Sequence, residues 1–206
     1  MSFEPPLTFR GRYVDLVPVS LDQVTDLAAV GTDPEIWRYK RQGFADTPER
    51  MRLRLEKTLA EQAAGRQLPF TILAKPSGSP IGQTSYLEIR REHRGVSIGD
   101  TWLTPSVWRT PVNTEAKYLL LRHAFETEGC LRVQFRTDLR NLRSQRAIER
   151  LGARRELVAR HDIVMPDGFV RDTVYYSILR EEWPSVRAGL EEKLSRPFPG
   201  TSAGAD

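Results

Sequence analysis

Alternating hydrophobic and polar positions predict a strand, a turn and a long helix between residues 96 and 126. The segment from Val96 to Thr104 mixes β-branched and aromatic residues, which is typical of a strand. Pro105 ends it, because proline has no N–H to donate to a ladder. We expect the helix to begin at Thr110-Pro111 or at Asn113, since Thr and Asn cap free amides and Pro suits the first turn.

The chain before this segment predicts alternating strands and helices. Serine or threonine precedes each expected helix and glycine follows it, and the second helix has an apolar face formed by Met51, Leu55 and Leu59. A Pro/Gly/Ser turn between two strand-like runs predicts a hairpin, and a turn at 91–95 adds a third antiparallel strand. The expected elements are a strand at 12–19, helices at 20–31 and 47–64, and hairpin strands at 69–75 and 81–90.

The chain after the central helix predicts a strand at 131–137, a helix at 141–152, a hairpin over 155–180 and a closing helix at 181–194. A strand, a crossover helix and a second strand form a βαβ unit, so the strands at 96–104 and 131–137 should be parallel. We expect a single α/β domain over residues 1–194, and a disordered tail over 195–206 because that segment is small and polar.

Composition places the chain among ordinary globular proteins and indicates a cytoplasmic location. Of the 206 residues 39% are hydrophobic and 28% charged, and the net charge is +4 with a pI near 9.4. No apolar run approaches the roughly 20 residues that cross a bilayer, and the N-terminus has no apolar signal core. The single cysteine, Cys130, excludes an internal disulfide. Neither a membrane nor a nucleic acid is an expected partner, since the pI alone is weak evidence for RNA binding.

Familiar catalytic signatures are missing from the sequence. The three histidines and Cys130 have no zinc-ligand spacing, so we expect no metal. Neither a phosphate-binding GxxxxGK[ST] loop nor a GxSxG nucleophile motif occurs.

The turn before the central helix is a candidate anion site. Backbone N–H groups converge at a helix N-terminus, the helix dipole adds roughly half a positive charge there, and Arg109 adds a full charge. A diphosphate suits such a place. The alternative is that Thr110 and Asn113 only cap the helix and that Glu115 answers its dipole.

Two blocks of sequence resemble the GNAT acetyltransferase superfamily, and more narrowly its RimJ/RimL-type branch. They are IGDTWLTPSVWRTPVNTEAKYLLLRHAFE at 98–126 and RTDLRNLRSQRAIERLGA at 136–153. The resemblance implies a mixed α/β fold with a mostly antiparallel seven-stranded sheet. It also implies that acetyl-CoA binds where the parallel strands 96–104 and 131–137 splay apart.

The resemblance further implies the residues that bind the cofactor. The backbone of Trp102, Leu103 and Thr104 would pair with pantetheine amides, and Asn141 would also bind pantetheine. The turn from Arg109 to Thr114, which includes Thr110, Val112 and Asn113, would hold the pyrophosphate. Arg143 and Arg146 can reach cofactor phosphates, although a solvated helix face explains these arginines equally well.

This pyrophosphate turn departs from the family pattern Q/R-x-x-G-x-G/A. Both glycines are absent, and Pro111 cannot donate a hydrogen bond. We expect the hydroxyls of Thr110 and Thr114, the amide of Asn113 and the charge of Arg109 to compensate.

Acetyl transfer to an amine requires a neutral amine, a donor to the carbonyl oxygen and a partner for the leaving thiolate. Ser144 is the candidate for the last role, one helical turn after Asn141 and on the same side of the helix. The alternative is that Asn141 caps the helix and Ser144 is a first-turn polar residue. Glu88 is the first candidate for the base and Asp100 the second, although either can be a solvated carboxylate. His161 and Asp162 are less favoured.

These observations predict an acetyl-CoA-dependent N-acetyltransferase that acts on a primary amine, with a protein N-terminal amine as the first choice of acceptor. The alternatives are a small amine such as a polyamine or an antibiotic, or a non-catalytic acyl-CoA-binding protein. Trp37, Tyr39 and Phe44 could line an acceptor pocket, though aromatics at such positions are more often core. The sequence leaves a homodimer open.

Overall fold

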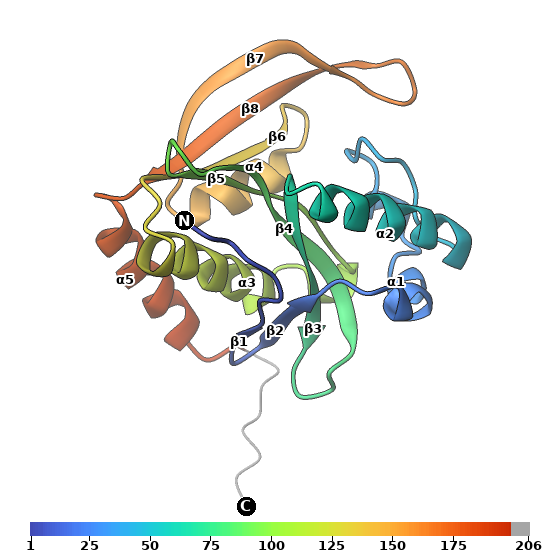
Figure 1. Cartoon of the computed structure of the whole chain (residues 1–206), viewed down its shortest axis with the longest axis horizontal. Helices are drawn as coiled ribbons and strands as arrows, with labels where there is room; N and C mark the ends of the chain where they lie inside the picture. Colours follow the sequence, from blue (N-terminus) through green and yellow to red (C-terminus); the bar gives the residue numbers. More distant parts are fainter. Residues whose placement is uncertain (199–206) are drawn as a thin grey trace, which may run out of the picture.

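The computed structural model describes residues 1–198, in which one mixed β-sheet of eight strands is flanked by helices (Figure 1). The strand order is β1-β2-β3-β4-β5-β6-β8-β7, and every neighbouring pair except β5 with β6 is antiparallel. The strands are β1 (Phe9–Arg10), β2 (Val14–Pro18), β3 (Gln67–Ala74), β4 (Pro80–Arg90), β5 (Gly95–Leu103), β6 (Arg132–Asp138), β7 (Arg154–Val164) and β8 (Val170–Leu179).

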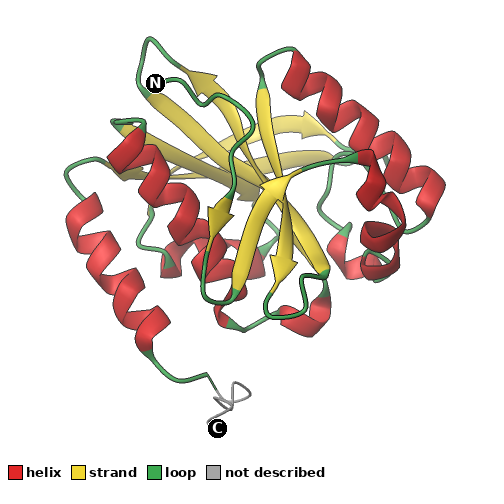
Figure 2. Cartoon of the chain, turned by 60° about the horizontal axis from the view of Figure 1, so that its bottom comes forward, coloured by secondary structure: helices red, strands yellow, loops and turns green. Residues whose placement is uncertain are grey.

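Helices cover the sheet on two sides, with α1 and α2 on one side and α3 and α5 on the other (Figures 1 and 2). A short π-helical turn extends α3, and three 3-10 turns precede α1, α2 and α3. The α-helices are α1 (Val24–Val30), α2 (Pro48–Ala63), α3 (Pro111–Arg122), α4 (Leu142–Arg150) and α5 (Trp183–Ser195). The shorter turns are η1 (Leu21–Gln23), η2 (Pro34–Ile36), η3 (Pro105–Val107) and η4 (His123–Thr127).

Side-chain caps occur at Ser20, Thr47 and Asn141, where the sequence predicted helix starts. The side chains of Ser20, Thr47 and Asn141 each accept a hydrogen bond from a first-turn N–H of the helix they precede. For α3 the structure decides between the two predicted starts, because Thr110 is the N-cap and Pro111 the first helical residue.

The sheet has eight strands, whereas we expected seven. The extra strand is β1, of only two residues, which pairs with β2 through Phe9–Leu16 and Arg10–Asp15. Two residues are too few to show a period, so the sequence could not reveal this strand. The predicted disordered tail, residues 195–206, lies largely outside the described residues. Its first residue, Ser195, is the last residue of α5.

The parallel pair β5 and β6 is joined over only a short length. Gly95, Val96 and Ser97 lie opposite Arg132, Val133 and Gln134, and beyond these three pairs the two strands diverge. Each strand remains paired with its other neighbour, β4 or β8, along its length. The expected splayed pair is therefore present, and it opens the sheet at its centre.

The apolar core surrounds this opening on both sides of the sheet. One buried cluster joins α3, α5 and the central strands, and includes Phe70, Tyr86, Leu120 and Tyr176. A smaller cluster joins α1, α2 and the loop between them to Trp102 of β5. No helix within residues 1–198 is long and apolar enough to span a membrane.

Candidate active site

A cavity of about 560 Å³ lies where β5 and β6 separate. Its walls come from β4, β5, β6, the first two turns of α3, one side of α4, one side of α2 and the loop between α1 and α2. Because β5 and β6 are unpaired beyond Ser97 and Gln134, the facing backbone groups of their diverging halves lack partners in the sheet. A ligand with amide groups can therefore bind along this edge.

A β-bulge shapes the β5 side of the cleft. Between two paired positions, Ser85–Gly99 and Gln83–Trp102, β5 has one more residue than β4. Asp100 lies in this bulge with φ +48°, in the left-handed region. The bulge turns Asp100 and Thr101 out of the regular alternation and places both at the cavity.

The predicted cofactor residues of β5 differ in what they offer. Trp102 and Leu103 border the cavity. The N–H of Thr104, in contrast, donates to the Ile81 carbonyl at 2.9 Å, so this amide is already paired with β4. The Leu103 carbonyl accepts a hydrogen bond from the indole of Trp108 at 2.8 Å.

The N-terminus of α3 opens towards the same cleft through Asn113, which borders the cavity. The Thr110 hydroxyl accepts from the Val112 N–H at 3.4 Å and donates to the Val107 carbonyl at 2.7 Å, so both groups are engaged. Thr114 is half-buried in the same turn. Arg109 is exposed, with φ +61°, and does not border the cavity.

The alternative interpretation gave Glu115 the role of balancing the helix dipole. In the structure Glu115 also binds the backbone of another segment. Its buried carboxylate accepts three backbone N–H bonds from Arg12, Tyr13 and Val14, at 2.8, 2.6 and 2.8 Å. These bonds hold the turn between β1 and β2 against α3.

Helix α4 presents Asn141 and Ser144 to the cavity. The Asn141 Oδ1 accepts the Ser144 N–H at 3.0 Å, so the capping interpretation of Asn141 is correct, and the side-chain NH₂ of Asn141 is the group left to donate to a ligand. Arg146 is exposed and does not border the cavity, whereas Arg143 and Arg150 do. Arg146 lies two positions after Ser144, which is more than half a helical turn, so its side chain points away from the face that holds Ser144.

Glu88, the first candidate for the base, lies on β4 and borders the cavity. One carboxylate oxygen contacts Arg136 of β6 at 2.7 Å, and the other accepts the Ser97 hydroxyl at 2.9 Å. Glu88 thus spans the point at which β5 and β6 begin to separate. His161 and Asp162, which we favoured less, lie on β7 outside the cavity.

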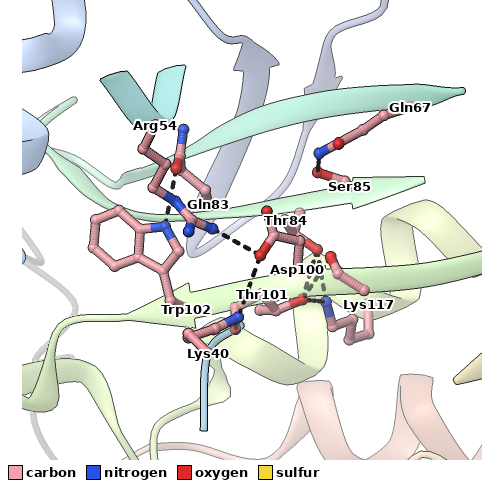
Figure 3. Close-up of polar contacts among 11 residues, drawn as sticks. Lys40, Arg54, Gln67, Gln83, Thr84, Ser85, Asp100, Thr101, Trp102 and Lys117 are labelled. Atoms are coloured by element: carbon pink, nitrogen blue, oxygen red, sulfur yellow. Dashed lines mark hydrogen bonds and ion pairs between the residues drawn. The ribbon is translucent and has the colours of Figure 1, made fainter. Parts of the chain in front are cut away.

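Asp100, the second candidate for the base, is held by two cations (Figure 3). Its Oδ1 lies 2.7 Å from Arg54 of α2 and 3.6 Å from Lys40 of the loop before α2. Burial alone would raise the pKa of Asp100, but Arg54 and Lys40 outweigh burial and hold that pKa below its usual range. A carboxylate so stabilised is a poor proton acceptor.

Lys117 of α3 is a buried amine that the sequence did not single out (Figure 3). Its Nζ donates to the hydroxyl of Thr84 at 2.7 Å and to the hydroxyl of Thr101, which joins β4 and β5 at the bulge. Burial, with the charge of Lys40 adding to it, lowers the pKa of Lys117 to about 7.

Lys40 is the second amine at the cavity. Its Nζ donates to the Thr101 carbonyl at 2.6 Å. Burial lowers the pKa of Lys40 to about 8. The carboxylate of Asp100 acts to raise this pKa, and the positive charges of Arg54 and Arg171 lower it further. Lys40, Arg54, Asp100 and Lys117 come from four separate segments, so no local motif could have identified their cluster.

The three aromatic residues proposed for an acceptor pocket separate in the structure. Trp37 is core, because it is 2% exposed and its indole donates to the Gly31 carbonyl. Tyr39 borders the cavity, and Phe44 is exposed outside it. Trp108, which the sequence did not single out, borders the cavity with the Arg143 guanidinium 3.6 Å from its ring centre.

Solved structures resemble this chain over nearly its whole length. A candidate acetyltransferase from T. thermophilus is 43% identical with a TM-score of 0.84, and the match covers 93% of this chain and 98% of that one. A GCN5-related N-acetyltransferase from Brucella melitensis is 26% identical with a TM-score of 0.89, covering 97% and 91%. RimJ from Mycobacterium smegmatis, solved in complex with CoA-disulfide, shares the fold at 22% identity and a TM-score of 0.74, covering 87% and 88%.

No curated protein matches the chain. A family model for the acetyltransferase (GNAT) domain matches residues 14–154, which is more than half of the sequence. That range includes the splayed pair, the α3 turn and α4. The chain belongs to the GNAT acetyltransferase family.

Proposed function

We propose that this protein transfers an acetyl group from acetyl-CoA to a primary amine, and that the reaction takes place in the cleft between β5 and β6. The observation that carries the proposal is the separation of these strands after three paired positions, with Asn141 and Ser144 of α4 bordering the opening. Family membership implies acetyl-CoA as the co-substrate, which supplies the acetyl group as a thioester.

The residues at the cleft fit such a ligand. Unpaired backbone along β5 suits pantetheine amides, and the positive end of α3 beside Asn113 suits a pyrophosphate. Arg143 and Arg150 add positive charge on α4. The structural likeness to RimJ from Mycobacterium smegmatis, which was solved with CoA-disulfide, is consistent with this placement.

We assign the stabilisation of the leaving thiolate to Ser144. Its hydroxyl borders the cavity and forms no hydrogen bond within residues 1–198, so it is free to donate to a departing thiolate. Serine is a weak acid, and its contribution is therefore hydrogen bonding. Backbone N–H groups of the splayed part of β5 serve the carbonyl oxygen as it gains charge.

Deprotonation of the acceptor is assigned to the cleft as a whole and to Glu88. The two amines that the protein itself places at this cavity, Lys40 and Lys117, have pKa values lowered to about 8 and about 7, because burial disfavours an ammonium there. An acceptor amine that enters the same cavity experiences the same effect. Glu88, which has one cationic partner where Asp100 has two, receives the proton directly or through water, and Asp100 stays a structural anion.

The acceptor that we favour is a protein N-terminal amine, because an α-amine has a pKa near 8 and loses its proton more readily than a lysine. A small amine is the alternative. The domain comprises residues 1–194 and works in the cytoplasm.

The decisive experiment measures thiol release from acetyl-CoA with a panel of amines, together with CoA binding by calorimetry. We expect Ser144→Ala to slow turnover roughly tenfold, as for loss of one hydrogen bond to a charged group, with CoA affinity unchanged. Asn141→Ala should weaken CoA binding itself. Binding without thiol release on any amine would identify a non-catalytic acyl-CoA-binding protein instead, and absence of binding would refute the proposal.

A further inference from the structure

The chemistry of the acceptor follows from the charges in the part of the cleft that faces α2, which we call the acceptor half. It is formed by α2, the loop between α1 and α2, the start of β3, the bulge of β5 and the facing parts of β4, β6 and β8. Cationic side chains outnumber carboxylates in it. The cations are Lys40, Arg41, Lys57, Arg66, Arg136 and Arg171, and the carboxylates are Glu61, Glu88, Asp100 and Asp138.

Every one of these carboxylates already has a cationic partner. Two of the partners, Arg54 and Arg140, do not border the cavity, but they neutralise Asp100 and Asp138, which do. The pairs are Glu61–Arg66 at 2.7 Å, Glu88–Arg136 at 2.7 Å, Asp100–Arg54 at 2.7 Å and Asp138–Arg140 at 2.8 Å. A cationic acceptor would therefore meet no free carboxylate.

Two cations of the acceptor half remain without an ion pair. Within residues 1–198 neither Arg41 nor Lys57 has a carboxylate within 4 Å, and both side chains are exposed. Glu61 is an acid on which the charges of both Arg41 and Lys57 act, and both of its oxygens accept hydrogen bonds from Arg66, at 2.7 and 2.9 Å. The hydrogen bonds from Arg66, with the charges of Lys57 and Arg41 adding to them, hold the pKa of Glu61 below its usual range.

The same charges act on any amine in the cleft. A surplus of cations disfavours an ammonium, and a second positive charge on the acceptor would be repelled without compensation. An anionic group on the acceptor would instead be attracted and could pair with Arg41 and Lys57.

We propose that the acceptor is an amine that also carries a carboxylate, and that Arg41 and Lys57 bind this carboxylate while the amine reaches the splay of β5 and β6. The inference rests on the proposed function and narrows its acceptor. A free amino acid and an acidic peptide N-terminus share this chemistry, whereas a polyamine lacks it.

The test compares kcat/KM for matched acceptors at low ionic strength. The panel contains C-terminally amidated peptides of sequence Ser-Glu-Glu-Ala and Ser-Lys-Lys-Ala, the amino acid glutamate with its carboxylate-free counterpart glutamine amide, and spermidine. We expect the acidic member of each pair to be favoured about tenfold or more, with the preference reduced by salt, because exposed charges are screened. A preference among the peptides alone identifies a protein substrate, and one among the amino acids identifies a metabolite.

Charge reversal at the two unpaired cations locates the effect. Lys57→Glu and Arg41→Glu should each abolish or invert the acidic preference while CoA affinity stays the same. Arg52→Glu is the matched control, because Arg52 is exposed on α2 but does not border the cavity. This control should keep the wild-type preference.

The outcomes separate this inference from the proposed function. CoA binding and turnover with spermidine or the basic peptide preferred would overturn the inference and leave the proposed function intact. An acidic preference that Arg52→Glu removes as fully as Lys57→Glu would also overturn it, since the effect would then come from net charge. No thiol release with any acceptor would remove the proposed function itself.

Discussion

Lys117 shows how one buried residue can link the state of this cleft to pH. Its amine is held between the hydroxyls of Thr84 and Thr101, which also lie 2.9 Å from each other. The cross-link fastens β5 to β4 at the bulge, where the strand has lost its partner on the other side. A protonated Lys117 therefore stabilises the bulge locally and costs desolvation energy at the same time.

Replacing Lys117 should change how stability depends on pH. The pKa of Lys117 is about 7 in the folded protein, whereas that of a free lysine side chain is about 10.5, so between these values the unfolded chain binds the extra proton. Wild-type stability should rise with pH across this window and show no Lys117 contribution to the slope below pH 7. Lys117→Met should reduce the rise in Tm between pH 7 and 9 by roughly half, because Lys40, whose pKa is lowered to about 8, contributes in the same direction.

Thermal unfolding at half-unit steps of pH tests this. The Thr84 and Thr101 hydroxyls stay bonded to each other in Lys117→Met, so the variant should fold. Lys57→Met, an exposed lysine on α2, is the control and should leave the slope unchanged. Identical slopes for Lys117→Met and wild type would show that Lys117 is not a depressed amine.

Among the elements, α3 departs most from the family pattern expected for it. Its first helical residue is Pro111, where a glycine-rich turn would supply backbone donors, and the Val112 N–H is engaged by Thr110. The helix start is thus well capped, but it has fewer free N–H groups for a phosphate. The cap therefore stabilises α3 but leaves fewer backbone N–H groups that could donate hydrogen bonds to a ligand.

Pro111→Ala should restore one backbone donor at this turn. We expect CoA to bind about fivefold more tightly, which corresponds to roughly 1 kcal/mol for one added hydrogen bond. Calorimetric titration with CoA measures the change. Pro48→Ala, at the equivalent first position of α2, should not alter affinity, and an unchanged affinity in Pro111→Ala would place the pyrophosphate away from this turn.

At the scale of the whole molecule, the cleft divides the sheet into two halves held together by few strand pairs. Only the three positions from Gly95 to Ser97 join β5 to β6, while α3 and α5 pack across one side. A ligand that fills the cleft contacts both halves. Binding should therefore stabilise the fold as a unit.

Acetyl-CoA at about 100 times its dissociation constant should add about 2.7 kcal/mol to the free energy of unfolding. For a chain of this size that corresponds to a rise in Tm of roughly 5–10 °C. Differential scanning fluorimetry with acetyl-CoA, CoA and adenosine as a control measures it. No rise with either CoA compound would contradict a cleft that binds this ligand.

The sequence by itself determined the features that depend on neighbouring residues. The caps at Ser20, Thr47 and Thr110, the turn at Pro111 and the parallel crossover into β6 could all be predicted, because local hydrogen bonding and chain direction govern them. The two sequence blocks also indicated the family. Each of these blocks is a continuous segment of the chain, so its motif can be recognised without knowing the fold.

Only the tertiary structure decided how the charged residues are paired. Lys40 and Arg54 meet at Asp100 from segments up to 60 positions away in the sequence, and this meeting turned a candidate base into a paired anion. The rotation of α4 likewise placed Arg143 at the cavity and Arg146 away from it. Such facts depend on how elements pack and on which groups lose water when they do, and a one-dimensional pattern contains neither.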